Sequence, residues 1–227
     1  MALFGSALGA HARAALTGPF LVSKVDITFV GSLGSLDPTS DATFIGSHTR
    51  VCVLATAAAF RGVDEAVDRV RQHLAASGAT IDVVAGLDRA SAHDALSLDV
   101  LARADVAILV DGAALHARSV WRATPLGAAL GTSRLIAIGW SGSVLGATMI
   151  DPRGGAPTTG LGLFHGVVVG LATGVEESAR TRGLLGGDVL YAQLGARAVV
   201  TYNGHWRVDV HDDLVVTRGF EATRLER

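Results

Sequence analysis

The sequence is poor in residue types that several common functions require. It has one cysteine, Cys52, among 227 residues. An intramolecular disulfide, a zinc site built from cysteines and a thiol relay are therefore excluded. Charged residues make up 18%, below the roughly 25% of an ordinary soluble domain, and aromatic residues 5%. The formal net charge of −2 leaves no excess of Lys and Arg to neutralise phosphates, so we expect no nucleic-acid partner.

Long hydrophobic runs are also lacking. No stretch of 18 or more residues is free of charged residues and turn formers, as a membrane-spanning helix would require. The nearest candidate, residues 160–175, is shorter and contains five glycines and a histidine. The first sixteen residues have no basic segment ahead of an apolar one, which argues against a secretory signal. The sequence predicts a soluble, cytoplasmic protein without a membrane span.

Hydrophobic residues and glycine are abundant instead. Hydrophobic residues make up 49% of the chain, enough for a sizeable core, and the 28 glycines imply many tight turns. This composition excludes a disordered chain and a coiled coil. The length favours one large domain, which we place at residues 25–227, preceded by an N-terminal extension over residues 1–24.

The order of apolar segments predicts an α/β fold. Short runs without alternation are typical of strands buried on both faces, and segments with helical spacing lie between them. Such alternation favours a mainly parallel central sheet flanked by helices. Pro125 is expected to divide the third helix. The predicted strands are residues 25–30, 50–55, 81–85, 106–110 and 135–138, and the predicted helices are residues 63–77, 92–102 and 119–130.

After about residue 160 the pattern changes to short β-rich segments. Residues 167–169, 198–202 and 213–216 read as strands, and Asn203-Gly204 predicts a hairpin turn. We expect these C-terminal strands, some of them antiparallel, to extend one edge of the same sheet.

One motif points to chemistry. Residues 135–138 form a buried strand that runs into Gly139-Trp140-Ser141-Gly142-Ser143, with a small-residue helix start behind it. This order is typical of a nucleophile elbow, in which a strained turn holds the serine hydroxyl above the end of the sheet. The amide of Gly142 would then serve as one oxyanion donor. A plain strand-to-helix turn, with small residues that only permit close packing, is the alternative.

Several further segments, in this order along the chain, carry a resemblance to a known family. They are Val51-Cys52-Val53-Leu54-Ala55-Thr56-Ala57, Ala104-Asp105-Val106-Ala107-Ile108-Leu109-Val110-Asp111-Gly112, Trp121-Arg122-Ala123-Thr124-Pro125-Leu126, Gly139-Trp140-Ser141-Gly142 and Gly160-Leu161-Gly162-Leu163. The chain resembles the cyanophycinase and peptidase E family of serine peptidases. The resemblance implies a flavodoxin-like, class I glutamine amidotransferase-like fold, with Ser141 as nucleophile and the Gly112 amide as a second oxyanion donor. It also implies a homodimer.

The sequence departs from this family where a serine needs its base and its acid. The resemblance places the family histidine at Ala172 and the acidic residue before it at Gly170. The supporting acid is missing from residues 194–198. This pattern predicts a triad-deficient pseudoenzyme that binds, regulates or assembles with a partner.

An active enzyme remains the alternative, namely a serine hydrolase that uses Ser141 with a non-standard base. His116 and His165 are the candidate bases, and Asp111 or Asp151 could orient one of them. The spacing of His, Asp and Glu suggests no metal site, and no cofactor is expected. The loop over residues 31–35 follows the first strand as a phosphate-binding loop would, but it lacks Gly-x-Gly-x-x-Gly and the Walker lysine.

Overall fold

The central element is a seven-stranded sheet that is parallel except at one edge. The computed structural model describes residues 25–187, 189–210, 213–218 and 221–224, so the predicted extension over residues 1–24 lies outside it. Strands β1, β5, β4, β2 and β3 are mutually parallel, and β10 pairs antiparallel with β1. In spatial order the strands are β11 (Trp206–Val210), β10 (Val199–Tyr202), β1 (Asp26–Val30), β5 (Arg134–Ile138), β4 (Val106–Leu109), β2 (Arg50–Leu54) and β3 (Thr80–Val84).

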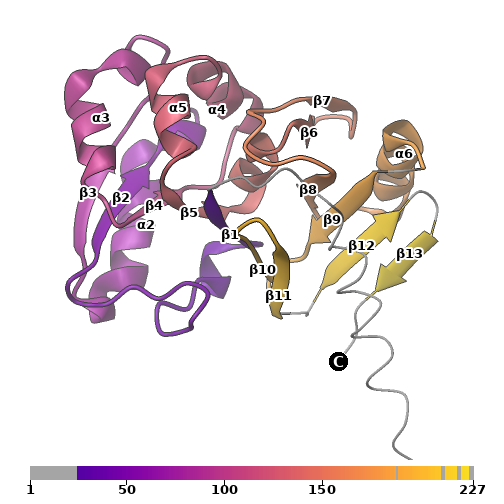
Figure 1. Cartoon of the computed structure of the whole chain (residues 1–227), viewed down its shortest axis with the longest axis horizontal. Helices are drawn as coiled ribbons and strands as arrows, with labels where there is room; N and C mark the ends of the chain where they lie inside the picture. Colours follow the sequence, from indigo (N-terminus) through magenta and orange to yellow (C-terminus); the bar gives the residue numbers. More distant parts are fainter. Residues whose placement is uncertain (1–24, 188, 211–212, 219–220, 225–227) are drawn as a thin grey trace, which may run out of the picture.

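Helices cover both faces of this sheet (Figure 1). Helix α2 (Val63–Leu74) packs with one set of strand side chains, whereas α4 (Ala114–Trp121) and α5 (Pro125–Leu130) pack with the other set. Helix α3 (Ala95–Ala102) contributes Leu101 to the second set. The parallel α/β prediction is therefore confirmed. The chain breaks between α4 and α5 just before Pro125, as predicted.

Short 3₁₀ turns lie at the junctions between these elements. They are η1 (Leu33–Ser35), η2 (Thr56–Ala58), η3 (Ala75–Ser77), η4 (Ser91–His93) and η5 (Gly139–Leu145). The last of these follows β5 directly, where the sequence predicted the start of a helix.

A second sheet corrects the prediction for the C-terminal strands. Only β10 and β11 extend the central sheet, with Asn203-Gly204 in the turn between them. Four other strands form a separate sheet, seen at the right of Figure 1 together with α6 (Val175–Leu185). In order they are β13 (Glu221–Arg224), β12 (Leu214–Arg218), β9 (Leu190–Leu194) and β8 (Val167–Leu171). A small hairpin pairs β6 (Thr148–Ile150) with β7 (Pro157–Thr159).

A tight turn over residues 195–198 lies where the chain passes from one sheet to the other. The Gly195 amide donates to the Asp213 carbonyl at 2.9 Å, and the Ala198 amide donates to the Gly195 carbonyl at 3.1 Å. This turn carries the chain from β9 in the second sheet to β10 in the central sheet.

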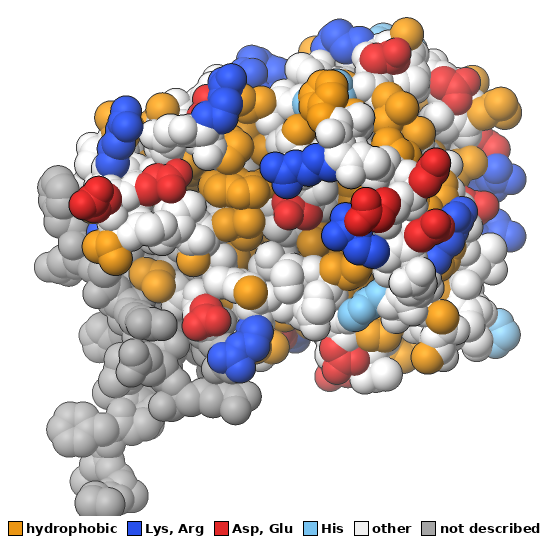
Figure 2. Space-filling view, turned by 180° about the vertical axis from the view of Figure 1, so that it is seen from behind, with side chains coloured by type: hydrophobic (Ala, Val, Ile, Leu, Met, Phe, Trp, Pro, Cys, Tyr) orange, Lys and Arg blue, Asp and Glu red, His pale blue; other side chains and the backbone are white. Residues whose placement is uncertain are grey.

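The surface mixes all side-chain types. On the face shown in Figure 2, charged side chains of both signs are interspersed with hydrophobic ones. Across the described residues, no helix combines the length and the apolar character that crossing a bilayer would demand.

Candidate functional site at the carboxyl ends of the central strands

The carboxyl ends of β1, β4 and β5 meet at one edge of the central sheet, where ligands bind in open α/β folds. The residues that follow these strands are Gly31, Asp111 and Gly139, each within two positions of a strand end. Ser141, Gly142 and Gly112 lie just beyond these strand ends, so their individual contacts decide what the site can do.

Ser141 lies inside η5, and its side chain is fully buried at 0% exposure. Its hydroxyl donates to the backbone carbonyl oxygens of Ile138 at 2.8 Å and Leu109 at 3.0 Å. The left-handed backbone conformation after β5 belongs to Gly139, with φ +59°, and not to the serine. The arrangement therefore differs from the predicted nucleophile elbow, because the hydroxyl points back at the sheet rather than standing free above it.

Asp111 lies beside the turn at Gly139. Its Oδ1 accepts a hydrogen bond from the Trp140 amide at 2.8 Å, and its side chain is otherwise exposed. A Cβ atom at Gly139 would come within 2.4 Å of the Asp111 carboxyl carbon, so glycine is required there for space as well as for its backbone conformation. A carboxylate thus lies directly against the turn after β5.

The two predicted oxyanion donors occupy packed positions. A Cβ at Gly112 would approach the Ala57 carbonyl oxygen to 2.2 Å, and a Cβ at Gly142 would approach the Phe29 ring to 2.9 Å. Both glycines are buried. Close packing therefore accounts for their small size.

The two candidate bases lie elsewhere. His116 Nε2 is 2.8 Å from the Leu87 carbonyl oxygen, and its ring packs edge-on against Phe60 with centroids 4.6 Å apart. His165 is exposed, just before β8. The hydrogen-bond partners of the Ser141 hydroxyl are both backbone carbonyls, and neither histidine hydrogen-bonds to it. Asp151, the other candidate acid, pairs with Arg153 at 2.9 Å, and this contact lowers its pKa.

The positions that the resemblance assigns to the family acid and histidine lie in the second sheet. A Cβ at Gly170 would meet the Tyr191 hydroxyl at 2.9 Å, so the tyrosine fills that space. Burial raises the pKa of Tyr191 to about 12, which keeps the phenol neutral. Ala172 follows β8 and lines a cavity of ≈450 Å³, together with the partly buried or buried polar side chains of Thr173, Ser178 and Gln193.

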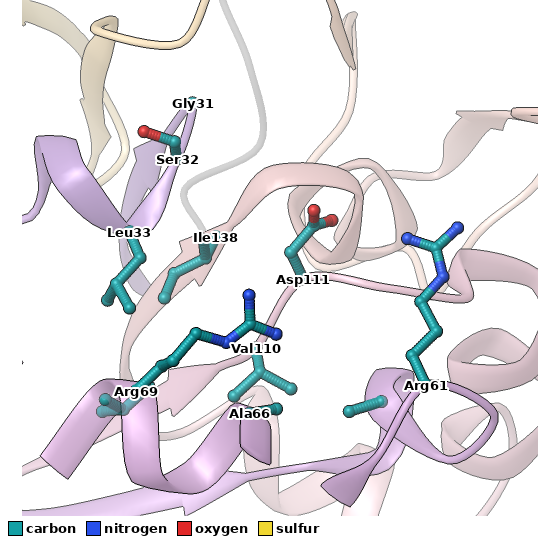
Figure 3. A pocket seen from close by; sticks show the side chains of 11 residues that line it. Gly31, Ser32, Leu33, Arg61, Ala66, Arg69, Val110, Asp111 and Ile138 are labelled. Atoms are coloured by element: carbon teal, nitrogen blue, oxygen red, sulfur yellow. The ribbon is translucent and has the colours of Figure 1, made fainter.

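A cleft of ≈290 Å³ opens at the same edge of the central sheet as Asp111 (Figure 3). Its walls come from the loop after β1, the ends of β4 and β5, and helix α2. Arg61 and Arg69 bring two guanidinium groups to it, and the sequence analysis singled out neither of them. The one signal in the sequence was the loop over residues 31–35, whose Gly31, Ser32 and Leu33 line this cleft.

Comparison with known proteins identifies the fold. No protein-family model and no curated protein matches the sequence. The crystal structure of a peptidase from an acI-B1 actinobacterium superimposes with a TM-score of 0.68, at 16% identity, over 92% of this chain and 95% of that one. The fold is peptidase E-like. A peptidase E protein of Listeria monocytogenes EGD-e agrees, with a TM-score of 0.55 and 12% identity over 85% of this chain and 98% of that one.

At these identities the likeness is one of fold alone. The peptidase E-like fold agrees with the architecture that the sequence resemblance implied, namely one α/β domain with added antiparallel strands. What this chain does with the fold depends on the side chains at its sheet edge.

Proposed function

We propose that this peptidase E-like protein is a non-catalytic member of its fold, and that it acts by binding a ligand or partner rather than by hydrolysis. The observation that carries the proposal is the environment of Ser141. Its hydroxyl is buried and bonded to two carbonyl oxygens, and neither can remove its proton.

The charge beside the turn supports the same proposal. Acyl transfer through a serine builds negative charge on an oxyanion, which preorganised donors must stabilise. The Trp140 amide, next to Ser141, already donates to the Asp111 carboxylate. That carboxylate would repel a second negative charge in its vicinity.

An activity-based probe tests the proposal. A fluorophosphonate reacts with a serine that has an activated hydroxyl, and we expect no labelling of the wild-type protein above the level of Ser141→Ala. Ser143→Ala is the matched control, because Ser143 is equally buried in η5 and donates to the Trp140 carbonyl at 2.9 Å. Labelling that is lost in Ser141→Ala and kept in Ser143→Ala would overturn the proposal in favour of a serine hydrolase.

The homodimer that the sequence resemblance implies is part of this proposal. Light scattering of the purified full-length chain is expected to give twice the monomer mass. A monomer at all accessible concentrations would refute the homodimer, and the proposal would then rest on ligand binding alone.

A further inference from the structure

We propose that the cleft between α2 and the carboxyl ends of β1, β4 and β5 binds a small oxyanion, a carboxylate or a phosphate, on a molecule that also carries a hydroxyl group. The inference rests on the proposed binding function and names the chemistry of its ligand. It follows from the charged groups, the shape of the cleft and the loop after β1.

The two arginines supply the anion-binding groups. Arg61 precedes α2, and Arg69 lies two turns into the helix, so that both line the cleft. The Arg61 guanidinium has no ion-pair or hydrogen-bond partner within the described ranges of the chain, where the backbone amide of Arg61 donates to the Ala58 carbonyl at 2.8 Å. Arg69 lies 4.0 Å from Glu65, with both side chains more than half exposed. An ion pair that exposed contributes little free energy, so it does little to hold the Arg69 guanidinium. Ten guanidinium N–H groups are therefore almost uncommitted, and a guanidinium matches the two oxygens of a carboxylate or phosphate.

Asp111 gives the cleft its second polar element. In the view of Figure 3 its carboxylate lies between the two guanidinium groups, at the rim formed by the end of β4. Oδ1 is held by the Trp140 amide, which fixes the carboxylate in place, while Oδ2 has no hydrogen-bond partner among the described residues. The two arginines and this acid sum to one positive charge. An oxyanion that meets the guanidinium groups, together with a hydroxyl that donates to Oδ2, would match the charge and the hydrogen-bonding capacity of these side chains.

The remaining walls set the size and the polarity of the ligand. Ala66, Val70, Val110 and Ile138 line the cleft with apolar atoms. Ser32, from the loop after β1, also lines it, but its hydroxyl donates to the Ala196 carbonyl at 2.8 Å. A volume of ≈290 Å³ lies just below the range for most ligand sites, roughly 300–1,000 Å³. The cleft therefore suits a molecule with a short carbon chain and not a whole nucleotide.

Two probes separate the possible sources of the oxyanion. Malate presents carboxylates and a hydroxyl, glycerol 3-phosphate presents a phosphate and hydroxyls, and succinate is the matched control that lacks the hydroxyl. Calorimetric titration of the full-length protein is expected to show binding of malate, of glycerol 3-phosphate, or of both, with Kd of about 1 mM or tighter. Which of the two binds identifies the oxyanion as carboxylate or phosphate.

Variants connect this binding to the cleft. Arg61→Gln and Arg69→Gln are each expected to raise the Kd of the probe about tenfold or more, because each removes a charge-assisted contact. Arg71→Gln is the matched control: it lies on the same helix, outside the cleft, and pairs with Asp68 at 3.2 Å. All three arginines are exposed, so thermal unfolding should confirm that the variants fold like the wild type.

Asp111→Asn tests whether the acid disfavours an anion that lacks a hydroxyl, because the variant should change the affinity for such an anion in a defined direction. The amide oxygen can still accept from the Trp140 amide, but the negative charge is gone, so succinate should bind more tightly than to the wild type. The wild type is expected to prefer malate over succinate, and this preference should shrink in the variant.

Three outcomes overturn the inference: no binding of either probe below about 10 mM, unchanged affinity in both Arg61→Gln and Arg69→Gln, or equal losses in Arg71→Gln. These failures are distinct from failure of the proposed function. Fluorophosphonate labelling of Ser141 would refute the non-catalytic role whatever the anion titrations give, and absent anion binding would leave the labelling result as it stands.

Discussion

Replacement of Ser141 by alanine tests whether the residue supports the structure, because a catalytic and a structural serine differ in the sign of the effect on stability. A serine held for catalysis is commonly neutral or unfavourable for folding, and its removal leaves stability unchanged or raised. The Ser141 hydroxyl instead donates inside the core to the carbonyl oxygens of Ile138 and Leu109. Its loss should therefore destabilise the protein.

The magnitude follows from these two contacts. A hydroxyl has one proton, so it bonds fully to one carbonyl at a time, and a net hydrogen bond contributes about 1 kcal/mol. Where the buried carbonyl that loses its donor stays unsatisfied, the cost is instead its desolvation penalty of about 1–3 kcal/mol. We expect Ser141→Ala to lower the free energy of unfolding by about 1–3 kcal/mol. For a chain of this size, that corresponds to a fall in Tm of roughly 2–12 °C.

Urea unfolding followed by circular dichroism, together with thermal unfolding, measures this change. Ser119→Ala is the control, since Ser119 is exposed and its hydroxyl donates to the His116 carbonyl at 2.7 Å. It should change stability by no more than about 0.5 kcal/mol. A Ser141→Ala protein as stable as the wild type, or more stable, would refute the structural interpretation of this serine.

Three other predictions concern packing and ionisation. Gly112→Ala should destabilise the protein by about 1–3 kcal/mol or more in urea unfolding, because its Cβ would lie 2.2 Å from the Ala57 carbonyl oxygen, whereas Gly154→Ala, with nothing within 4 Å, should not. Burial raises the pKa of Cys52 to about 12, so iodoacetamide at pH 8 should label the thiol only after unfolding; rapid labelling of the native protein would contradict this. The hydrogen bond from Ser97 lowers the pKa of Asp94 at the start of α3 below its usual 3.8. The ionised Asp94 carboxylate therefore stabilises the fold fully above its pKa in the unfolded state, and this stabilisation is lost as the pH falls through its pKa in the folded state. Tm should drop in acid below about pH 4, and less steeply in Asp94→Asn. Equal slopes of Tm against pH would show that this carboxylate contributes nothing to stability.

The parallel strands of the central sheet could be predicted because burial on both faces leaves a clear pattern, whereas the edge strand β11 was not predicted. The runs that became β2, β4 and β5 contain few polar residues, and Pro125 marked the break before α5 without ambiguity. The division into two sheets could not be predicted in this way. An apolar run such as Val167-Val168-Val169 fits any buried strand, and the pattern does not indicate that the chain changes sheets at the turn over residues 195–198.

The conformation of single residues at the site could not be predicted from the sequence either. The sequence Gly139-Trp140-Ser141 is compatible with an exposed or a buried serine, and the outcome depends on which residue adopts the left-handed conformation. Gly139 adopts it, and Ser141 turns inward. Arg61 and Arg69 looked like ordinary polar residues around an amphipathic helix. Their role in the cleft emerges only where the loop after β1 and the ends of β4 and β5 come together.

The pairing of β1 with β10 has a consequence for how the protein is made. Ile27 lies opposite Tyr202, so the first strand of the central sheet has no outer neighbour until the distant strand β10 has also been synthesised. At ribosomal speeds this delay is on the order of ten seconds or more, during which one edge of β1 has open hydrogen-bonding groups. A nascent chain stalled before β10 should therefore recruit chaperones or aggregate, and the rate of translation between β1 and β10 becomes a determinant of yield.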